Sequence, residues 1–354
     1  MNAPAGIMAA HIRTVDLGEA DERARLAAFV DAADGSLFHR PEWLRAVEAG
    51  TGNPALGLVA EGQGGIEGWL PLVFVRSPIF GNALVSSGFG VGGGVLADDP
   101  VVADRLCRAA EELAVRRGVA EVELRGGPAP ADWHPVEGKH ANFSAPLAED
   151  DEAQLLAIPR KARAEVRKGL KRDLDIACGS GEAERAAHYA VYAESVRNLG
   201  TPVFPRSLFD RMLDAFGEDA EIMVVRHEGQ PVSSVLSFYH HGAVMPFWGG
   251  GVPAARGLHS TERMYYELMC RARERGCTRF DFGRSKTGSG PFRFKKNWGF
   301  EPEPLTYRRW TAPGCEARDI DPAGEGTSRG VAMWKRLPLP LANRIGPAIA
   351  RGLG

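Results

Sequence analysis

Apolar runs in the second half of the chain predict several strands followed by a helix. Residues 221–227, 232–240 and 243–249 are mostly apolar, and glycine-containing segments separate them, as is typical of strands joined by hairpin turns. Residues 260–275 instead repeat their apolar positions at helical spacing. The positions that form this stripe are Met264, Tyr265, Leu268, Met269 and Ala272.

The segment after this helix is expected to return to the sheet. Phe280 and Phe282 alternate with polar residues, so both rings should point to one face and Asp281 to the other. The helix itself has candidate start and stop signals, because Ser and Thr cap helices and Gly adopts the left-handed conformation that ends them. These signals are Ser260 or Thr261 at the start and Gly276 at the end.

The first half of the chain repeats the same order of features. Apolar runs at 56–60 and 66–75 precede a glycine-rich stretch, a helical segment from Pro100 to Gly118 and a short strand. Three markers recur in the same order: the tripeptide EGQ at 61–63 and 228–230, three glycines at 92–94 and 249–251, and Arg-Gly at 117–118 and 275–276. This repetition predicts a duplicated βββαβ unit, with mixed sheets flanked by helices, and therefore an α/β (α+β) fold.

Length and composition are consistent with a two-domain globular protein. The chain has 354 residues, of which 44% are hydrophobic and 25% charged, and its formal charge is −2. A polyanionic partner would therefore need a local basic patch. No apolar run reaches the length of a membrane span and the N-terminus lacks a basic signal-peptide region, so we expect a cytoplasmic protein. Five scattered cysteines predict neither a disulfide framework nor a metal site.

A basic segment at 158–176 lies between the two repeats. It predicts one helix after Pro159 whose cationic residues form two stripes. This helix is either a solvated connector or a cationic wall for the phosphates of a nucleotide, a carrier or a tRNA. Its basic residues are Arg160, Lys161, Arg163, Arg167, Lys168, Lys171 and Arg172.

Residues 281–300 combine glycines, cations and aromatic rings more densely than any other part of the chain. Glycines allow backbone N–H groups to approach an anion, and cations add charge-assisted hydrogen bonds. The segment therefore predicts an anion-binding lip, and the alternative is an amphipathic return strand packed by its rings. The cations are Arg284, Lys286, Arg293, Lys295 and Lys296, and the rings are Phe292, Phe294, Trp298 and Phe300.

Several better-known motifs do not match. The stretch GRSKTGSG lacks the Lys that a phosphate-binding P-loop requires after its second glycine, and it does not fit G-x-S-x-G. Residues 88–93 do satisfy G-x-G-x-x-G. However, the helix that follows starts too late, near Pro100, to favour dinucleotide binding.

Taken together, these segments resemble the FemAB-related acyltransferases, in particular the group associated with exosortase and PEP-CTERM systems. The resemblance rests on FDFGRSKTGSGPFRFKKNWGFEP, FHRPEW, PRKARAEVRKGLK and WKRLPLPLANRIGP. It implies two tandem GNAT-like acyltransferase domains, at 1–150 and 181–312, with a basic connecting helix at 151–180 and a tail at 313–354. It further implies transfer of an acyl or aminoacyl group to an amine of a cell-envelope or exopolysaccharide precursor, without metal or cofactor.

The family pattern F-K-x-x-W-G falls on Phe294, Lys295, Trp298 and Gly299, which implies a catalytic role for Lys295. A protonated lysine is suited to stabilise the oxyanion of acyl transfer. Asp281 would orient the basic groups or accept the proton of the amine, and a structural salt bridge is the alternative for it. The expected substrate-binding residues are Arg284, Ser285, Lys286, Arg293, Phe294, Lys296, Trp298, Arg163 and Arg167.

The acyl donor is either aminoacyl-tRNA or acyl-CoA. The stretch after Gly251, VPAARGLHSTER, lacks the [QR]-x-x-G-x-[GA] pattern of CoA-binding GNAT enzymes, which favours a tRNA or another carrier. The balanced net charge, in contrast, argues against a large tRNA footprint. Two alternative functions are an acyl-CoA-dependent N-acyltransferase that acts on a lipid or small amine, and a non-catalytic accessory protein of polysaccharide assembly.

The tail at 331–354 contains four basic residues and no acidic one, interspersed with apolar residues. It is either docked on the body of the protein or makes a peripheral contact with the inner membrane.

Overall fold

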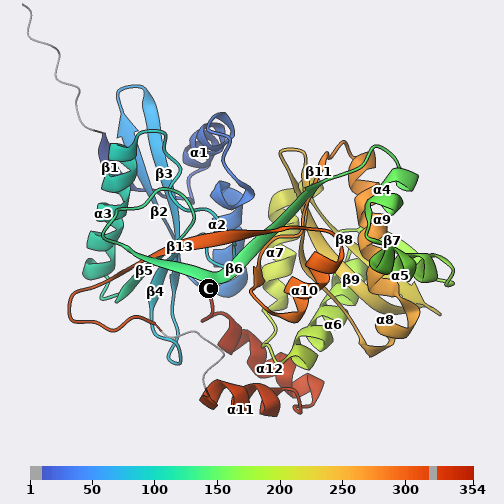
Figure 1. Cartoon of the computed structure of the whole chain (residues 1–354). Helices are drawn as coiled ribbons and strands as arrows, with labels where there is room; N and C mark the ends of the chain where they lie inside the picture. Colours follow the sequence, from blue (N-terminus) through green and yellow to red (C-terminus); the bar gives the residue numbers. More distant parts are fainter. Residues whose placement is uncertain (1–9, 319–324) are drawn as a thin grey trace, which may run out of the picture. The chain divides into compact units, whose positions relative to one another are not determined.

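The computed structural model describes residues 10–318 and 325–354, which fall into two compact units (Figure 1). The first unit contains Met1–Val136, Thr306–Ile320 and Arg351–Gly354, and the second contains Glu137–Leu305 and Asp321–Ala350. The chain enters the second unit within strand β6 (His134–Pro146) and returns within strand β13 (Pro302–Thr311).

The first unit is built on a sheet with the strand order β1-β2-β3-β4-β5-β13. Neighbouring strands are antiparallel except β4 and β5, which are parallel because helix α3 (Pro100–Arg116) crosses between them. Helix α3 is amphipathic and buries its apolar face on the sheet. The remaining elements are β1 (His11–Thr14), α1 (Ala20–Ala32), η1 (Leu37–His39), α2 (Pro41–Thr51), β2 (Ala55–Gly62), β3 (Gly65–Val75), β4 (Ala83–Ser86) and β5 (Glu121–Arg125).

The second unit has the strand order β6-β11-β10-β9-β8-β7, and the short strand β12 pairs with β6. Here too only one pair in this order, β10 and β11, is parallel, and helix α9 (Ser260–Glu274) makes the crossover. The other strands are β7 (Asp175–Gly179), β8 (Ala220–His227), β9 (Gln230–His240), β10 (Ala243–Gly251), β11 (Arg279–Asp281) and β12 (Ser285–Lys286). The other helices are α4 (Asp151–Ala157), α5 (Arg160–Leu170), α6 (Glu182–Leu199), α7 (Arg206–Phe216), η2 (Gly217–Asp219), α8 (Pro253–Leu258), α10 (Gly290–Asn297), α11 (Glu325–Trp334) and α12 (Leu339–Ala350).

The predicted duplication is confirmed by the topology. Elements β2-β3-β4-α3-β5 and β8-β9-β10-α9-β11 follow in the same order and pair in the same directions. Gly118 and Gly276 both adopt positive φ, 64° and 81°, where the two crossover helices end. The predicted alternation around Asp281 is also confirmed, because Phe280 and Phe282 are buried in the core while Asp281 contacts Asn142 on the other face.

The two repeats use their glycine-rich stretch differently. In the first unit this stretch wraps the buried ring of Phe38: a Cβ added at Gly90 or Gly93 would lie 2.9 Å from Phe38 atoms. The indole of Trp43 also donates to the Gly88 carbonyl at 3.1 Å. Because side chains of the unit itself fill the space beside these glycines, the match to G-x-G-x-x-G reflects close packing.

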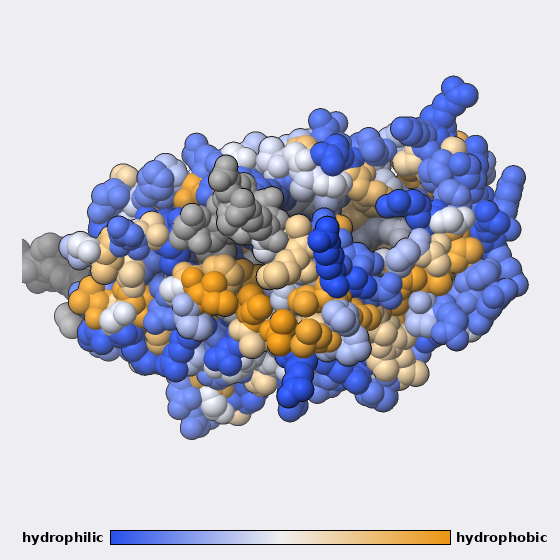
Figure 2. Space-filling view, turned by 90° about the horizontal axis from the view of Figure 1, so that it is seen from below, coloured by the Kyte–Doolittle hydropathy of each residue, from blue (hydrophilic) through white to orange (hydrophobic). Residues whose placement is uncertain are grey.

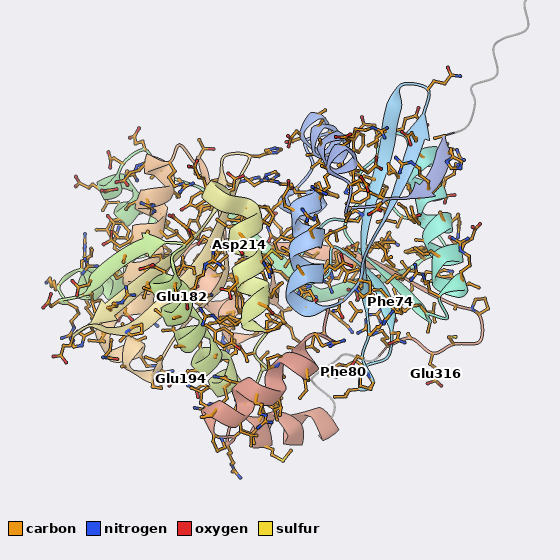
Figure 3. The ribbon with its side chains drawn as sticks, turned by 180° about the vertical axis from the view of Figure 1, so that it is seen from behind. Phe74, Phe80, Glu182, Glu194, Asp214 and Glu316 are labelled. Carbon is orange, nitrogen blue, oxygen red and sulfur yellow. The ribbon has the colours of Figure 1, made fainter. Side chains whose placement is uncertain are left out.

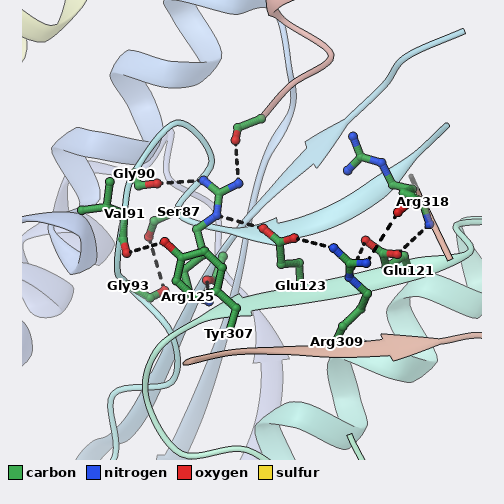
Figure 4. A network of polar contacts seen from close by, with 12 residues as sticks. Ser87, Gly90, Val91, Gly93, Glu121, Glu123, Arg125, Tyr307, Arg309 and Arg318 are labelled. Atoms are coloured by element: carbon green, nitrogen blue, oxygen red, sulfur yellow. Dashed lines mark hydrogen bonds and ion pairs between the residues drawn. The ribbon is translucent and has the colours of Figure 1, made fainter. Parts of the chain in front are cut away.

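A buried ionic network occupies the end of β5 in the first unit (Figure 4). Arg125 donates to Glu123 at 3.0 Å and to the carbonyls of Gly90 and Gly354. Arg309 bridges to Glu123 and Glu121, each at 3.3 Å. Although burial opposes it, Arg125 and Arg309 hold the pKa of Glu123 down to about 2.

Helices α6 and α7 of the second unit are joined by ion pairs to the carboxylates of Glu182 and Asp214, both labelled in Figure 3. Arg206 lies 2.5 Å from Glu182, and Arg185 lies 2.7 Å from Asp214.

Helices α6 and α9 both pack on β8, β9 and β10, and α5 packs against α9. His188 of α6 contacts Ser234 whereas Ser260 of α9 contacts Ser233, and adjacent residues of a strand point to opposite faces. The sheet of the second unit is therefore covered by helices on both faces.

Two segments differ from their predicted form, and the tail, whose secondary structure was not predicted, is helical. Residues 151–180, expected as one connecting helix, form α4, α5 and β7 within the second unit. The segment expected as a loop or return strand contains helix α10, whose N-cap Ser289 accepts from Phe292 N at 3.2 Å. The tail folds into α11 and α12, and α12 buries Ala342, Gly346 and Ala350. The chain passes between the compact units at residues 136–137 and 305–306, and the domain bounds 1–150 and 181–312 stay a prediction from the resemblance.

Candidate active site

The parallel strands of the second unit separate soon after they meet. Strand β11 pairs with β10 only at Ala243 and Val244, whereas β10 continues to Gly251 beside β9. A bulge between Pro246 and Trp248 further bends β10 in this stretch. β11 therefore does not pair with the carboxyl end of β10. In open sheets, ligands commonly bind at such strand ends.

A cavity of about 630 Å³ lies at this end of β10. Its lining comes from the end of β10, the end of α6, and the starts of α8, α9 and α10. The volume is in the range of sites that hold small-molecule ligands. Its polar and charged lining side chains are Ser195, Asn198, Arg256, Thr261, Glu262 and Tyr265.

Glu262 is the carboxylate of this cavity. Burial raises its pKa, the neighbouring charge of Glu165 adds to the rise, and His259 opposes it. No lysine or arginine forms an ion pair with Glu262 within residues 10–318 and 325–354. A half-buried carboxylate with a raised pKa is suited to accept a proton near neutral pH.

Two lining residues, Gly251 and Thr261, are held by close contacts where α8 and α9 meet the sheet. The hydroxyl groups of Ser233 and Ser260 lie 2.6 Å apart, and Thr261 lies 3.3 Å from Ser233. Gly251 packs closely here, because a Cβ on it would lie 2.8 Å from the Cβ of Ala255. The predicted capping of α9 by Ser260 or Thr261 is wrong: the N-cap is His259, with φ of 53°, and Ser260 is the first residue of the helix.

One wall of the cavity is aromatic. Tyr265 and Phe294 line it, with ring centroids 5.7 Å apart. Tyr265 also contacts the buried rings of Phe282 and Trp298 at 4.9 and 6.1 Å. Burial raises the pKa of Tyr265 to about 12, so its hydroxyl stays protonated at neutral pH. The cavity wall is therefore continuous with the core around β11 and α10.

Lys295 lies beneath this wall with its ammonium group buried. Nζ donates to the carbonyl oxygens of Phe282 at 2.6 Å, Gly283 at 2.9 Å and Arg284 at 3.2 Å. A charged lysine has three N–H donors, so these contacts use all of them. Burial lowers the pKa of Lys295 to about 7, while the charge of Asp281 opposes the shift. Lys295 does not line the cavity at β10, and it does not line a second cavity that Asp281 lines.

Asp281 supports the same turn from the other face of the sheet. Its Oδ1 accepts from Gly283 N at 2.9 Å and from Asn142 Nδ2 at 3.2 Å. It lines a second cavity, of about 580 Å³, together with Ser144, Arg279, Glu303 and others. The two residues expected to be catalytic thus hold the turn after β11 from opposite sides.

The other expected binding residues are spread over several environments. Phe294 lines the cavity, and Trp298 is buried in the adjoining core. Ser285 is buried and its hydroxyl finds no hydrogen-bond partner within the described ranges. Arg293 donates to the Gly288 carbonyl and Arg163 to the Leu156 carbonyl. None of the remaining residues lines either cavity: Arg167, Arg284, Lys286 and Lys296.

Sequence reasoning assigned a site role to none of the polar residues that line this cavity, Glu262 included. The signal was present, because Glu262 precedes Tyr265 and Met269 at helical spacing on the stripe that predicted α9. An acidic residue on an otherwise apolar face is a recognisable exception. Ser195, Asn198 and Arg256 reach the cavity from α6 and α8, and no spacing in the sequence indicates that approach.

Within the described parts of the chain, no group of three His, Cys, Asp or Glu side chains is arranged to hold a metal ion. No helix there has both the length and the apolarity that crossing a membrane requires.

Comparisons with known proteins agree with this geometry. Residues 159–296 match the family model of the acetyltransferase (GNAT) domain, and they contain β10, α9, β11 and the whole cavity lining. No curated protein matches the sequence. Among solved structures, FemX superposes with a TM-score of 0.62 at 16% identity, covering 84% of this chain and 96% of FemX.

Two further structures show the same fold. A tandem GNAT protein from the clavulanic acid biosynthesis pathway gives a TM-score of 0.55 at 14% identity, covering 86% of this chain and 100% of that one. The C-terminal domain of a protein named as a lysylphosphatidylglycerol synthetase, from Agrobacterium fabrum, gives 0.54 at 14% identity, covering 82% and 92%. The chain therefore has the mixed α/β fold of tandem GNAT proteins, and its residues 159–296 match the family model of the GNAT acetyltransferase domain.

Proposed function

We propose that the protein is an N-acyltransferase that transfers an acyl or aminoacyl group to an amine of a cell-envelope or exopolysaccharide precursor, in the cavity at the end of β10. The observation that carries the proposal is the position of Glu262, a carboxylate with a burial-raised pKa, in a cavity at the end of β10 within the residues that match the GNAT domain model. The association with exosortase and PEP-CTERM systems and a cytoplasmic location at the inner membrane belong to this proposal and rest on the sequence resemblance.

In the proposed reaction the amine nitrogen attacks the acyl carbonyl carbon and forms a C–N bond. The bond from that carbon to the sulfur or oxygen of the donor breaks, and the donor leaves as a thiol or hydroxyl. Glu262 accepts the proton that the amine loses and passes it to the leaving atom. The aromatic wall of Tyr265 and Phe294 excludes water, and Arg256, exposed at the rim, is placed to pair with a donor phosphate.

Lys295 acts in this proposal as a positioning residue. Its three hydrogen bonds connect α10 to the turn after β11, so they fix Phe294 against Tyr265 in the cavity wall. Asp281 fixes the same turn through Gly283 N. Direct contact of Lys295 with an oxyanion would require breaking at least one of these bonds.

Aminoacyl-tRNA and acyl-CoA remain the two candidate donors, and both present a phosphate and an activated acyl group. FemX and the tandem GNAT neighbour share the fold, and a fold alone does not select between donors. The donor can be identified by binding, because a ligand that binds only the folded protein raises its unfolding temperature.

The test is a thermal-shift titration with acetyl-CoA, longer acyl-CoAs and aminoacyl-tRNA. Gly290 lines the cavity and a Cβ there meets open space, so Gly290→Trp should fold and fill the cavity. Gly257 on α8 also has open space at its Cβ but lies outside the lining, which makes Gly257→Trp the matched control. We expect one donor class to stabilise the native protein and the control variant but not Gly290→Trp. Equal stabilisation of all three, or of none, would refute the site.

A further inference from the structure

The two tail helices leave a group of large apolar side chains exposed. We name Met333, Leu341 and Ile345 the apolar patch; these side chains are 68%, 44% and 37% exposed. Leu341 and Ile345 lie one turn apart on an exposed side of α12, next to the side that buries Ala342 and Gly346. Figure 2 shows hydrophobic residues gathered on the face of the molecule that carries α11 and α12. A folded helix that buries one apolar face and exposes another has a surface left to cover.

Every charged side chain in residues 330–350 of the tail is basic. Residues 330–350 contain Lys335, Arg336 and Arg344, all exposed, and no Asp or Glu. Arg344, one turn after Leu341 in α12, flanks the exposed side that carries Leu341 and Ile345. Long basic side chains beside apolar ones match the boundary of a bilayer, where the apolar groups enter the acyl region and the cations stay at the headgroups.

The patch is connected to the candidate active site through the end of α6. Gly200, which ends α6, packs on Val331 of α11, and Arg197 donates to the Lys335 carbonyl at 3.1 Å. Leu199, between them, is 61% exposed and also lines the cavity at β10. The rim of the cavity and the tail helices therefore belong to one local surface of the second unit.

We propose that the apolar patch docks the protein on an anionic lipid bilayer and so presents the cavity to a substrate held at the membrane surface. Docking requires only the tail surface, whereas presentation of substrate rests on the proposed function. An acceptor carried on a lipid would reach the cavity along Leu199. Docking through three apolar side chains and three cations is reversible, because neither hydrophobic insertion nor electrostatic attraction on this scale anchors a protein firmly.

The test is flotation of the full-length protein with vesicles of phosphatidylglycerol and phosphatidylcholine, compared with pure phosphatidylcholine. We expect binding to the anionic vesicles that weakens at high salt. The variant Lys335→Gln/Arg336→Gln/Arg344→Gln should partition on the order of 100-fold more weakly, since each cation near an anionic surface contributes about fivefold. The variant Met333→Ser/Leu341→Ser/Ile345→Ser should lose binding.

A matched control replaces exposed apolar residues elsewhere, as Ile79→Ser/Val115→Ser, and should bind like the native protein. Circular dichroism and unfolding temperature establish that each variant is folded. Absence of vesicle binding by the native protein, equal binding to neutral vesicles, or a native dimer that the serine substitutions dissociate would each overturn the proposal. Donor-induced thermal shifts of the same variants report on the proposed function separately, because none of the substituted residues lines the cavity.

Discussion

The ammonium nitrogen of Lys295 lies 2.6 Å from the carbonyl oxygen of Phe282. This bond joins helix α10 to the end of strand β11, and two more carbonyls of the same turn accept from the same nitrogen. The most distinctive cation of the 281–300 segment is thus directed into the protein. In the proposed reaction, Lys295 therefore acts only through the aromatic wall that α10 contributes to the cavity.

Replacing Lys295 with Met should destabilise the fold. The substitution keeps an unbranched side chain but leaves buried carbonyl oxygens without donors, which costs about 1–3 kcal/mol. The free energy of unfolding in urea measures this loss. Lys296→Met, at the exposed neighbouring position, should change it by less than about 0.5 kcal/mol. A Lys295→Met protein as stable as the native one would show that the hydrogen bonds are not structural.

The burial of Lys295 also predicts a pH dependence. Its pKa falls from 10.5 to about 7 on folding, so between these values the unfolded chain holds a proton that the folded protein has released. The free energy of unfolding therefore increases as pH rises from 7 to 10.5, because the folded protein no longer has to bury a charged ammonium group. Unfolding in urea across this range, for native protein and Lys295→Met, isolates the contribution. The difference in unfolding free energy between the two proteins should grow with pH. A constant or shrinking difference would contradict the lowered pKa of Lys295.

Breaking the buried network of the first unit should be costly. In Arg125→Met the carboxylate of Glu123 loses its nearest cation, and two carbonyls lose their donor. Removing one member of a buried ion pair costs about 3–5 kcal/mol. Arg116→Met, whose partner Glu112 lies 3.4 Å away at an exposed surface, serves as the control and should cost under about 1 kcal/mol. Similar unfolding midpoints for both variants would contradict the role assigned to the network.

The duplicated core could be predicted because its signals are local. Apolar runs, hairpin turns and helix-ending glycines such as Gly118 and Gly276 require no knowledge of tertiary contacts. The candidate site could not be predicted in the same way, because its residues converge from α6, α8, α9 and α10. Only Phe294 among the expected residues lines the cavity at β10.

Helix α10 shows how one local error affects a functional interpretation. The four glycines of residues 281–300, Gly288 and Gly290 among them, indicate a loop, although Ser289 followed by a proline in the first turn also marks a helix start. With 290–297 recognised as helical, Lys295 falls on the same face as Phe292 and Trp298 and is expected to point inward. The family pattern, in contrast, implies that Lys295 contacts the oxyanion of acyl transfer.

The most direct test of the proposed reaction is the rate of acyl transfer to an amine by Glu262→Gln. With the donor identified by thermal shift, we predict that this variant loses on the order of 100- to 10,000-fold in kcat while keeping donor binding. Native activity should also decline as pH falls through the raised pKa of Glu262, and the variant should lack this decline. Glu267→Gln, on the same helix and outside the cavity, should retain native kcat. An unchanged kcat and pH profile in Glu262→Gln would contradict the assignment of this cavity as the site of transfer.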